Sequence, residues 1–125
     1  MTDAMHFKVS CSAYDLWGSV IASGDDCTII INGGSSPHVG CVCLAIPRPS
    51  LTGEGISATV SVINRTGHMD DLVASDVAKQ VARARNCVVA CSCGIHIDHA
   101  TQKDVQHIQH ASVHVAEAII GLLSA

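Results

Sequence analysis

Three short segments of the chain combine a histidine with glycine at the end of an apolar run. They are residues 33–40 (GGSSPHVG), 66–70 (TGHMD) and 94–99 (GIHIDH). The second and third segments run into helical patterns, and the start of a helix offers free backbone N–H groups and a positive dipole end to an anion. The first segment is rich enough in glycine to fold its amides around an anion. Together they predict a site for a phosphate-bearing ligand.

A phosphate bound to this chain needs positive charge nearby, because the formal net charge is -4. A hydrogen bond to a phosphate oxygen is stronger when its donor is positively charged, and imidazolium and guanidinium groups are both such donors. The residues expected to do so are His38, His68, His96, Arg48 and Arg65.

The same side chains also permit a metal site. Imidazole and carboxylate are ligands that zinc and manganese accept, and His96 and Asp98 are two residues apart on one strand face. A metal-dependent enzyme would use His38, His68, His96 and Asp98 as ligands, with Asp70 or Asp71 as general base. The residue pattern alone leaves this alternative open.

The seven cysteines are a second group of potential ligands. An odd number in a chain without a secretion signal indicates reduced thiols. Cys41 with Cys43, and Cys91 with Cys93, each place two thiols on one face of a strand. Four thiolates could hold zinc if the two strands were neighbours, although zinc ligands are usually spaced more widely. Both pairs lie inside apolar runs, which favours small buried side chains.

Three further histidines, His107, His110 and His114, share one face of the last helical segment. That face is nearly opposite the apolar stripe of the segment, so a solvated or subunit-facing surface is favoured over metal binding. No Ser-His-Asp order, Walker loop, dinucleotide fingerprint or paired CxxC is found in the sequence. The chain is therefore not expected to be an enzyme.

Strands and helices in a fixed order must position these residues. Alternating or continuous apolar runs predict strands over residues 6–13, 16–22, 27–31, 39–46, 56–63 and 87–93. Apolar residues at helical spacing predict an amphipathic helix between His68 and Arg85, and a last helix that begins with a capping box at Thr101 and Asp104. The fold class is α+β: a mostly antiparallel sheet of strands followed by helix, strand and helix, with one parallel crossover.

The composition limits the domain count and the partners. A chain of 125 residues is the usual size of one domain, so residues 1–125 should form a single domain. No basic run is present, which argues against nucleic-acid binding. No apolar run approaches the ~18 residues of a spanning helix, and the N-terminus has no signal-peptide pattern, so a cytoplasmic protein without membrane contact is expected.

The motifs GGSSPHVG, TGHMDD and GIHIDHAT resemble the prenylated-flavin chaperone family, the small LpdD-like accessory subunits of UbiD-type gallate decarboxylases. The likeness extends from about residue 26 to 107. It implies a homodimer with a fold like that of proteasome assembly chaperones. It also implies binding of reduced prenylated FMN and its delivery to an apo decarboxylase that acts on hydroxybenzoic acids such as gallate or protocatechuate. By motif, the implied cofactor-binding residues are Gly33, Gly34, Pro37, His38, Gly67, His68, Gly94, His96 and Asp98.

Two other functions remain open from the sequence. One is the metal-dependent enzyme described above, and the other is an assembly chaperone without any ligand. For the homodimer, the last helix is the candidate interface.

Overall fold

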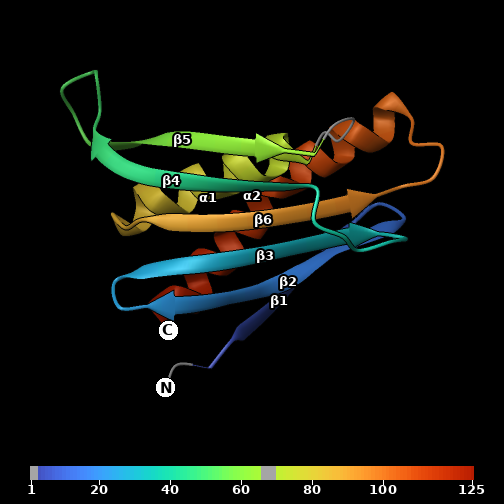
Figure 1. The fold of residues 1–125 in the computed structure, drawn as a ribbon, viewed down its shortest axis with the longest axis horizontal. Helices are drawn as coiled ribbons and strands as arrows, with labels where there is room; N and C mark the ends of the chain where they lie inside the picture. Colours follow the sequence, from blue (N-terminus) through green and yellow to red (C-terminus); the bar gives the residue numbers. More distant parts are fainter. Residues whose placement is uncertain (1–2, 66–69) are drawn as a thin grey trace.

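Alternating apolar residues form one six-stranded sheet, and two helices pack on one face of it (Figure 1). The computed structural model describes residues 3–65 and 70–125. The elements in chain order are β1 (Met5–Cys11), β2 (Tyr14–Ser23), β3 (Asp26–Gly34), β4 (Cys41–Pro49), β5 (Ile56–Asn64), α1 (Asp71–Arg85), β6 (Val89–His96) and α2 (Gln102–Ser124). The predicted order of strands followed by helix, strand and helix is confirmed.

The last strand of the chain lies inside the sheet. The strand order is β1-β2-β3-β6-β4-β5, so β6 separates β3 from β4. Strand β6 is parallel to β3 and antiparallel to β4, and the remaining neighbours are antiparallel. The prediction of a mostly antiparallel sheet with a parallel element is therefore confirmed, and the connection from β3 to β4 has to pass β6.

The hydrophobic core lies between the sheet and the two helices. Strand residues such as Leu16, Ile29 and Val89 have no exposed surface, and neither do Val77 of α1 and Val115 of α2. Among the described residues, no helix is long and apolar enough to cross a membrane. The apolar stripe predicted for each helix is thus used to cover one face of the sheet.

At the end of the sheet that carries the glycine-histidine segments, β3 and β6 are both longer than the sequence predicts. A break was expected at Asn32, because asparagine and glycine favour turns. The parallel ladder instead continues through Gly33 and Gly34, which pair with Ile95 and His96. The capping box of α2 is present as predicted: the Asp104 N–H donates to the Thr101 hydroxyl (3.1 Å), and the Thr101 N–H donates to the Asp104 carboxylate (2.9 Å).

The two cysteine pairs meet in the core. Strands β4 and β6 are neighbours, with Cys41 opposite Cys93 and Cys43 opposite Cys91. Burial, with a smaller contribution from the nearby carboxylate of Asp70, raises the pKa of Cys41 to about 12. All seven cysteines are buried free thiols, which confirms the interpretation as small core side chains. In residues 3–65 and 70–125, no group of three or more His, Cys, Asp and Glu side chains is placed to hold a metal ion.

These buried thiols should react only when the protein unfolds. The nucleophile is the thiolate, and burial raises the pKa values of both Cys27 and Cys41 to about 12. With Ellman's reagent at pH 8, we expect slow labelling of the native protein and rapid labelling of seven thiols in guanidinium chloride. Rapid labelling of all seven in the native protein would contradict this packing.

The same pKa shifts predict that the protein loses stability in alkaline solution. The unfolded thiols release protons near pH 9, whereas Cys27 and Cys41 retain theirs in the folded state to about pH 12. The folded state therefore binds more protons in this window, and the free energy of unfolding should fall as the pH rises from about 9 towards 12. Urea unfolding at pH 8 and pH 10.5 measures this, and a Cys27→Ala variant should show a shallower fall.

Candidate functional site

The insertion of β6 brings the first and third glycine-histidine segments together at one end of the sheet. Gly34 pairs with His96 in the parallel ladder. Directly after it, the Ser35 N–H donates to the His96 carbonyl (2.8 Å), and the Ser35 hydroxyl donates to the same oxygen (3.3 Å). Two segments about sixty residues apart thus form one structural unit.

The connection from β3 to β4 crosses over the end of β6 (Figure 1). Glycine is required at the crossing, because a Cβ on Gly94 would overlap the backbone carbonyl of His38. Beyond the crossing, the Gly40 N–H donates to the Cys93 carbonyl (2.9 Å). A Cβ on Gly40 would overlap the carboxylate of Asp70. The glycines let the connection lie close against β6 and carry His38 to the strand end.

Asp70, the residue before α1, is the buried polar group of this region, at 5% exposure. Its Oδ1 accepts the Ile95 N–H (2.9 Å), and its Oδ2 lies 3.5 Å from Nε2 of His38. On the other side of its ring, His38 places Nδ1 3.0 Å from the Ser36 carbonyl. Asp70 therefore connects the start of α1 to β6 and to the β3–β4 connection. From the sequence, Asp70 was expected only as a candidate general base.

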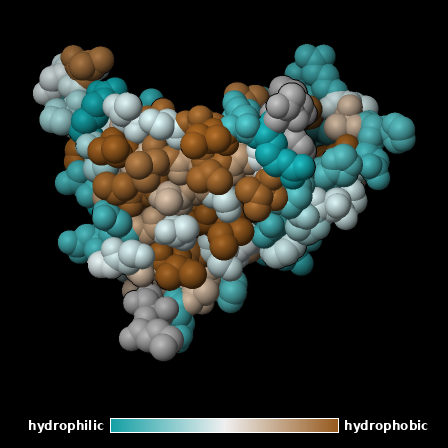
Figure 2. Space-filling view, viewed as in Figure 1, coloured by the Kyte–Doolittle hydropathy of each residue, from teal (hydrophilic) through white to brown (hydrophobic). Residues whose placement is uncertain are grey.

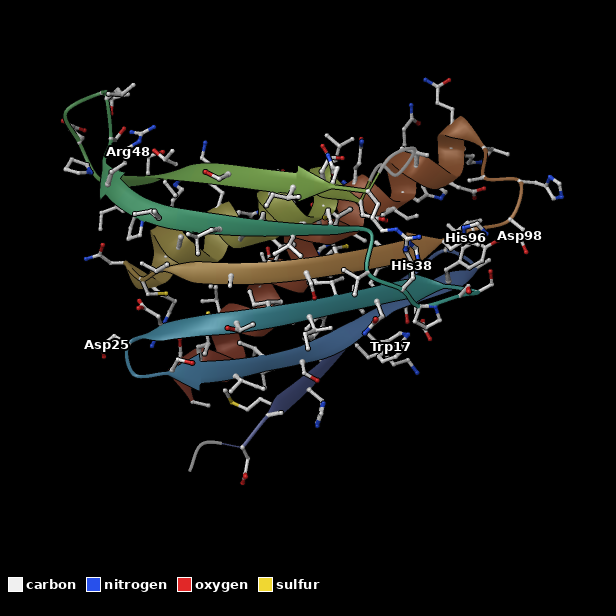
Figure 3. All side chains as sticks on the ribbon, viewed as in Figure 1. Trp17, Asp25, His38, Arg48, His96 and Asp98 are labelled. Atoms are coloured by element: carbon white, nitrogen blue, oxygen red, sulfur yellow. The ribbon has the colours of Figure 1, made fainter. Side chains whose placement is uncertain are left out.

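His96 and Asp98 form a more exposed pair beside this group (Figure 3). His96 Nε2 lies 2.8 Å from Asp98 Oδ1, and their side chains are 48% and 76% exposed. The ring centroids of His38 and His96 are 6.4 Å apart. Three of the predicted site side chains thus lie at the same end of the sheet, where a ligand can reach His96 from solvent.

The remaining predicted site residues of this region are Pro37, Arg65, Gly67 and His68. Pro37 is exposed in the crossing connection. Arg65 lies next to that connection, because its N–H donates to the Gly40 carbonyl (2.8 Å) and its guanidinium donates to the Val39 carbonyl (3.1 Å). Gly67 and His68 lie outside the described residues.

The prediction for Arg48 is wrong. Arg48 lies at the opposite end of β4, where its Nε donates to the Thr59 hydroxyl (2.9 Å), and Figure 3 shows it far from His38 and His96. The β4 strand runs for nine residues from the crossing, so an arginine near its far end cannot compensate a charge at its start.

The backbone amides of this region are largely occupied. The N–H groups of Ser35 and Gly40 both donate to β6 carbonyls, so they fasten the connection to the strand rather than surround an anion. At the start of α2, the Thr101 N–H donates to the Asp104 carboxylate and the Asp104 N–H donates to the Thr101 hydroxyl, so two of the N–H groups of this helix start are already hydrogen-bonded. The anion site at the start of α2 stays a prediction. Among the described side chains, those of His96, His38 and Arg65 lie at this end of the sheet and can donate to an anion.

An apolar pocket of about 320 Å³ opens beside these polar groups. It lies between the starts of the two helices and the end of β6, and its lining residues are Asp70, Leu72, Val73, Ile95, His96, Ile97, Ala100, Val105, Ile108 and Gln109. Sequence reasoning missed this pocket. The spacing of Val105 and Ile108 indicates a helix. It does not indicate that a pocket separates the first turns of α2 from α1.

The described side chains at this site have the form of a small-molecule binding site. The metal alternative needs at least three converging ligands, and the described residues provide no such group, although His68 is not among them. A pocket that is mostly apolar, with a few polar groups at one side, is the usual form of a small-molecule site. The pocket therefore offers an apolar surface, with the imidazole of His96 at its side and the guanidinium of Arg65 beside the crossing connection as hydrogen-bond donors.

Comparisons with known proteins identify similar sequences and a similar fold. The family described as the prenylated flavin chaperone LpdD-like domain matches residues 10–124. Protein LpdD of Lactiplantibacillus plantarum is 25% identical over 123 residues, which cover 95% of this chain and 85% of that protein. A chain in the crystal structure of a chaperone complex for yeast 20S proteasome assembly superposes with a TM-score of 0.58 at 11% identity, covering 98% of this chain and 95% of that one. The predicted likeness to the fold of proteasome assembly chaperones is confirmed.

The crossing at Gly94 can be tested by adding one methyl group. In Gly94→Ala, the new Cβ must displace the His38 carbonyl, so we expect a loss of about 1–3 kcal/mol in the free energy of unfolding. Urea denaturation measures this loss. The matched control is Gly121→Ala in α2, where the added Cβ meets open space and alanine favours the helix. Equal stability of the two variants would contradict the close crossing.

Proposed function

Because the chain belongs to the prenylated flavin chaperone LpdD-like family, we propose that it is a non-catalytic carrier of reduced prenylated FMN. The carrier would deliver this cofactor to an apo UbiD-type decarboxylase that acts on hydroxybenzoic acids such as gallate or protocatechuate. The observation that supports the proposal best is the apolar pocket that opens beside the His38–Asp70 and His96–Asp98 pairs.

The residues present fit the two chemical parts of such a cofactor. The dimethylbenzene part of the flavin and its prenyl-derived ring are apolar, and the lining of Val73, Ile95 and Ile108 is apolar as well. The phosphate is anionic, and the imidazoles of His96 and His38 and the guanidinium of Arg65 are donors at this end of the sheet that would hold it. Prenylated FMN supplies the decarboxylation chemistry in the partner enzyme, and this chain would only hold it.

A carrier has to release its ligand, and the exposure of the site supports that role. His96 is half exposed, whereas Asp70 beneath it is buried and hydrogen-bonded to the backbone. The buried part would keep the site in shape while the exposed part lets the ligand exchange. The proposal includes a homodimer of this chain and a transient complex with the decarboxylase.

Anaerobic titration of the purified protein with reduced prenylated FMN tests the proposal. We expect saturable binding, measured by the change in the flavin absorbance spectrum. We also expect a rise in the Tm of the protein, because a ligand that binds only the native state stabilises that state. His96→Ala and His38→Ala should weaken binding at least tenfold, since each removes a polar group at the site. His114→Ala, an exposed histidine on the later part of α2, is the matched control and should bind like the wild type.

The other outcomes separate the alternatives. Binding of neither prenylated nor unmodified reduced FMN would contradict the carrier function. In that case, about one tightly held zinc or manganese per chain, lost in His96→Ala, would favour the metal-dependent enzyme. Neither flavin nor metal, with unchanged binding of a partner protein, would favour an assembly chaperone without a ligand.

Blocking the apolar pocket gives a separate test. Ala100 is an exposed residue of the pocket lining, so Ala100→Trp should fill the mouth of the pocket without disturbing the core. We expect at least a tenfold loss of affinity for reduced prenylated FMN at unchanged Tm of the free protein. The matched control is Ala84→Trp on the exposed side of α1. Wild-type affinity in Ala100→Trp would place the ring system elsewhere.

A further inference from the structure

A groove lies on the side of α2 that faces away from the apolar pocket. Its volume is about 420 Å³, and its lining consists of residues 10–12 at the β1–β2 turn and of His107, His110, Ala111 and His114 on α2. We call it the histidine groove. Successive helix residues are about 100° apart around the axis, so its histidines lie nearly opposite Val105 and Ile108, which line the apolar pocket. The groove is therefore separate from the candidate flavin site.

The histidine groove belongs to the helix side of the molecule. Helix α2 lies behind the sheet in Figure 1, and Figure 2 shows the uncovered sheet face from the same direction, with apolar side chains gathered across it. The two surfaces differ in chemistry. The uncovered sheet face is suited to apolar contacts, whereas the groove presents imidazole nitrogens, which can hydrogen-bond or bind a metal.

Two histidines of the groove have the spacing of a chelating pair. His110 and His114 are four residues apart, which places two side chains next to each other on a helix, and the same spacing holds zinc in HExxH helices. Their ring centroids are 5.9 Å apart in an edge-to-face arrangement. Two imidazoles that share a tetrahedral zinc at Zn–N distances of about 2.0–2.1 Å have centroids roughly 5 Å apart. Small rotations of these two exposed side chains close that difference.

Glu117 is placed to orient one member of the pair. Its Oε2 lies 3.6 Å from Nδ1 of His114, and the two side chains are 66% and 57% exposed. A histidine that binds a metal through one ring nitrogen commonly donates its other N–H to a carboxylate, which fixes the tautomer and makes the ligating nitrogen more basic. A small rotation brings the Nδ1–H of His114 within hydrogen-bonding distance of Glu117 and leaves Nε2 for a metal.

The other groups of the groove leave the pair as the protein ligands. Burial raises the pKa of Cys11, and the carboxylate of Asp104 adds to this shift, so the thiol stays protonated at neutral pH and is not a thiolate ligand. Ser10 and Ser12 offer hydroxyl groups to metal-bound water. Because no three potential ligands converge within residues 3–65 and 70–125, water has to complete the coordination of an ion held here.

We propose that His110 and His114 bind one divalent transition-metal ion through their Nε2 atoms, with Glu117 as the positioning residue for His114. Imidazole suits zinc, nickel and copper, whereas magnesium and calcium prefer oxygen ligands. The bound ion crosslinks two successive turns of α2. The spacing of these histidines alone favoured a solvated or subunit-facing surface, and the groove and the ring geometry are what the structure adds. This site does not depend on flavin binding, and it is distinct from the metal alternative at His96.

Isothermal titration calorimetry of the untagged, metal-free protein with Zn²⁺ tests the site. The wild type should bind Zn²⁺ saturably, and His110→Ala and His114→Ala should each weaken this binding about tenfold or more, because a single imidazole cannot chelate. Alanine is a good helix former, so both variants should fold. His6→Ala is the matched control, an exposed histidine on β1 whose Nδ1 lies 2.8 Å from the Ser19 hydroxyl. It should bind like the wild type, as should His96→Ala.

The electron paramagnetic resonance spectrum of bound Cu²⁺ tests the ligand set and the role of Glu117. The wild type should show two imidazole nitrogens, and His110→Ala and His114→Ala one each. Glu117→Ala should weaken Zn²⁺ binding severalfold and keep the two-nitrogen spectrum. Glu117→Gln should restore part of the affinity, because its amide oxygen still accepts a hydrogen bond.

Three results would overturn the proposal. They are the absence of saturable Zn²⁺ binding, wild-type affinity in both His110→Ala and His114→Ala, and a wild-type Cu²⁺ spectrum with one nitrogen. Affinity that is lost in His96→Ala and kept in both α2 variants would place the ion at the other end of the chain's histidine set and would also contradict it. The flavin titration is run with a chelator present, so failure of the metal site leaves the carrier proposal untouched, and the reverse also holds.

Discussion

The position of β6 between β3 and β4 is the constraint on which the rest of the structure depends. Because β6, the last strand in the sequence, separates two strands that follow each other along the chain, the segment between those two strands has to cross the end of β6. That crossing can lie close only where glycine replaces a side chain, at Gly94 and Gly40. The same contact holds His38 against Asp70 and next to His96, so the fold and the candidate site share one geometric requirement.

The sheet separates two kinds of surface by its alternation. Residues on the helix side form the core, including the four thiols of β4 and β6, and burial raises the pKa of Cys41 and so favours its protonated form. Residues on the other side include exposed apolar side chains such as Ile30, Val42 and Leu44. The candidate site lies at the strand ends where these two sides meet, between the helix starts and the crossing connection. A ligand there contacts residues that pack against the core.

Much of the fold could be predicted from the sequence, because local patterns determine it. Alternation indicated the strands, helical spacing indicated both helices, and the Thr101–Asp104 capping box marked the start of α2 correctly. Strand ends were less accurate, since the glycines after Asn32 read as a turn but pair in a parallel ladder. The site was predictable in part: the first and third glycine-histidine segments do meet, but Arg48 lies at the far end of β4, and the N–H groups of Ser35 and Gly40 donate to β6. Strand order and the pocket between the helices depend on contacts distant in sequence, which no local pattern carries.

The central claim is that the end of the sheet around β6 holds the flavin, and backbone NMR under anaerobic conditions tests it most directly. Reduced prenylated FMN would be added stepwise to ¹⁵N-labelled protein. The account predicts saturable shift changes concentrated at Ser35, Asp70, Ile95 and His96 and in the first turns of α2, with little change around Asp25 at the opposite end. Saturable changes centred on Asp25, or no saturable change at any residue, would contradict it.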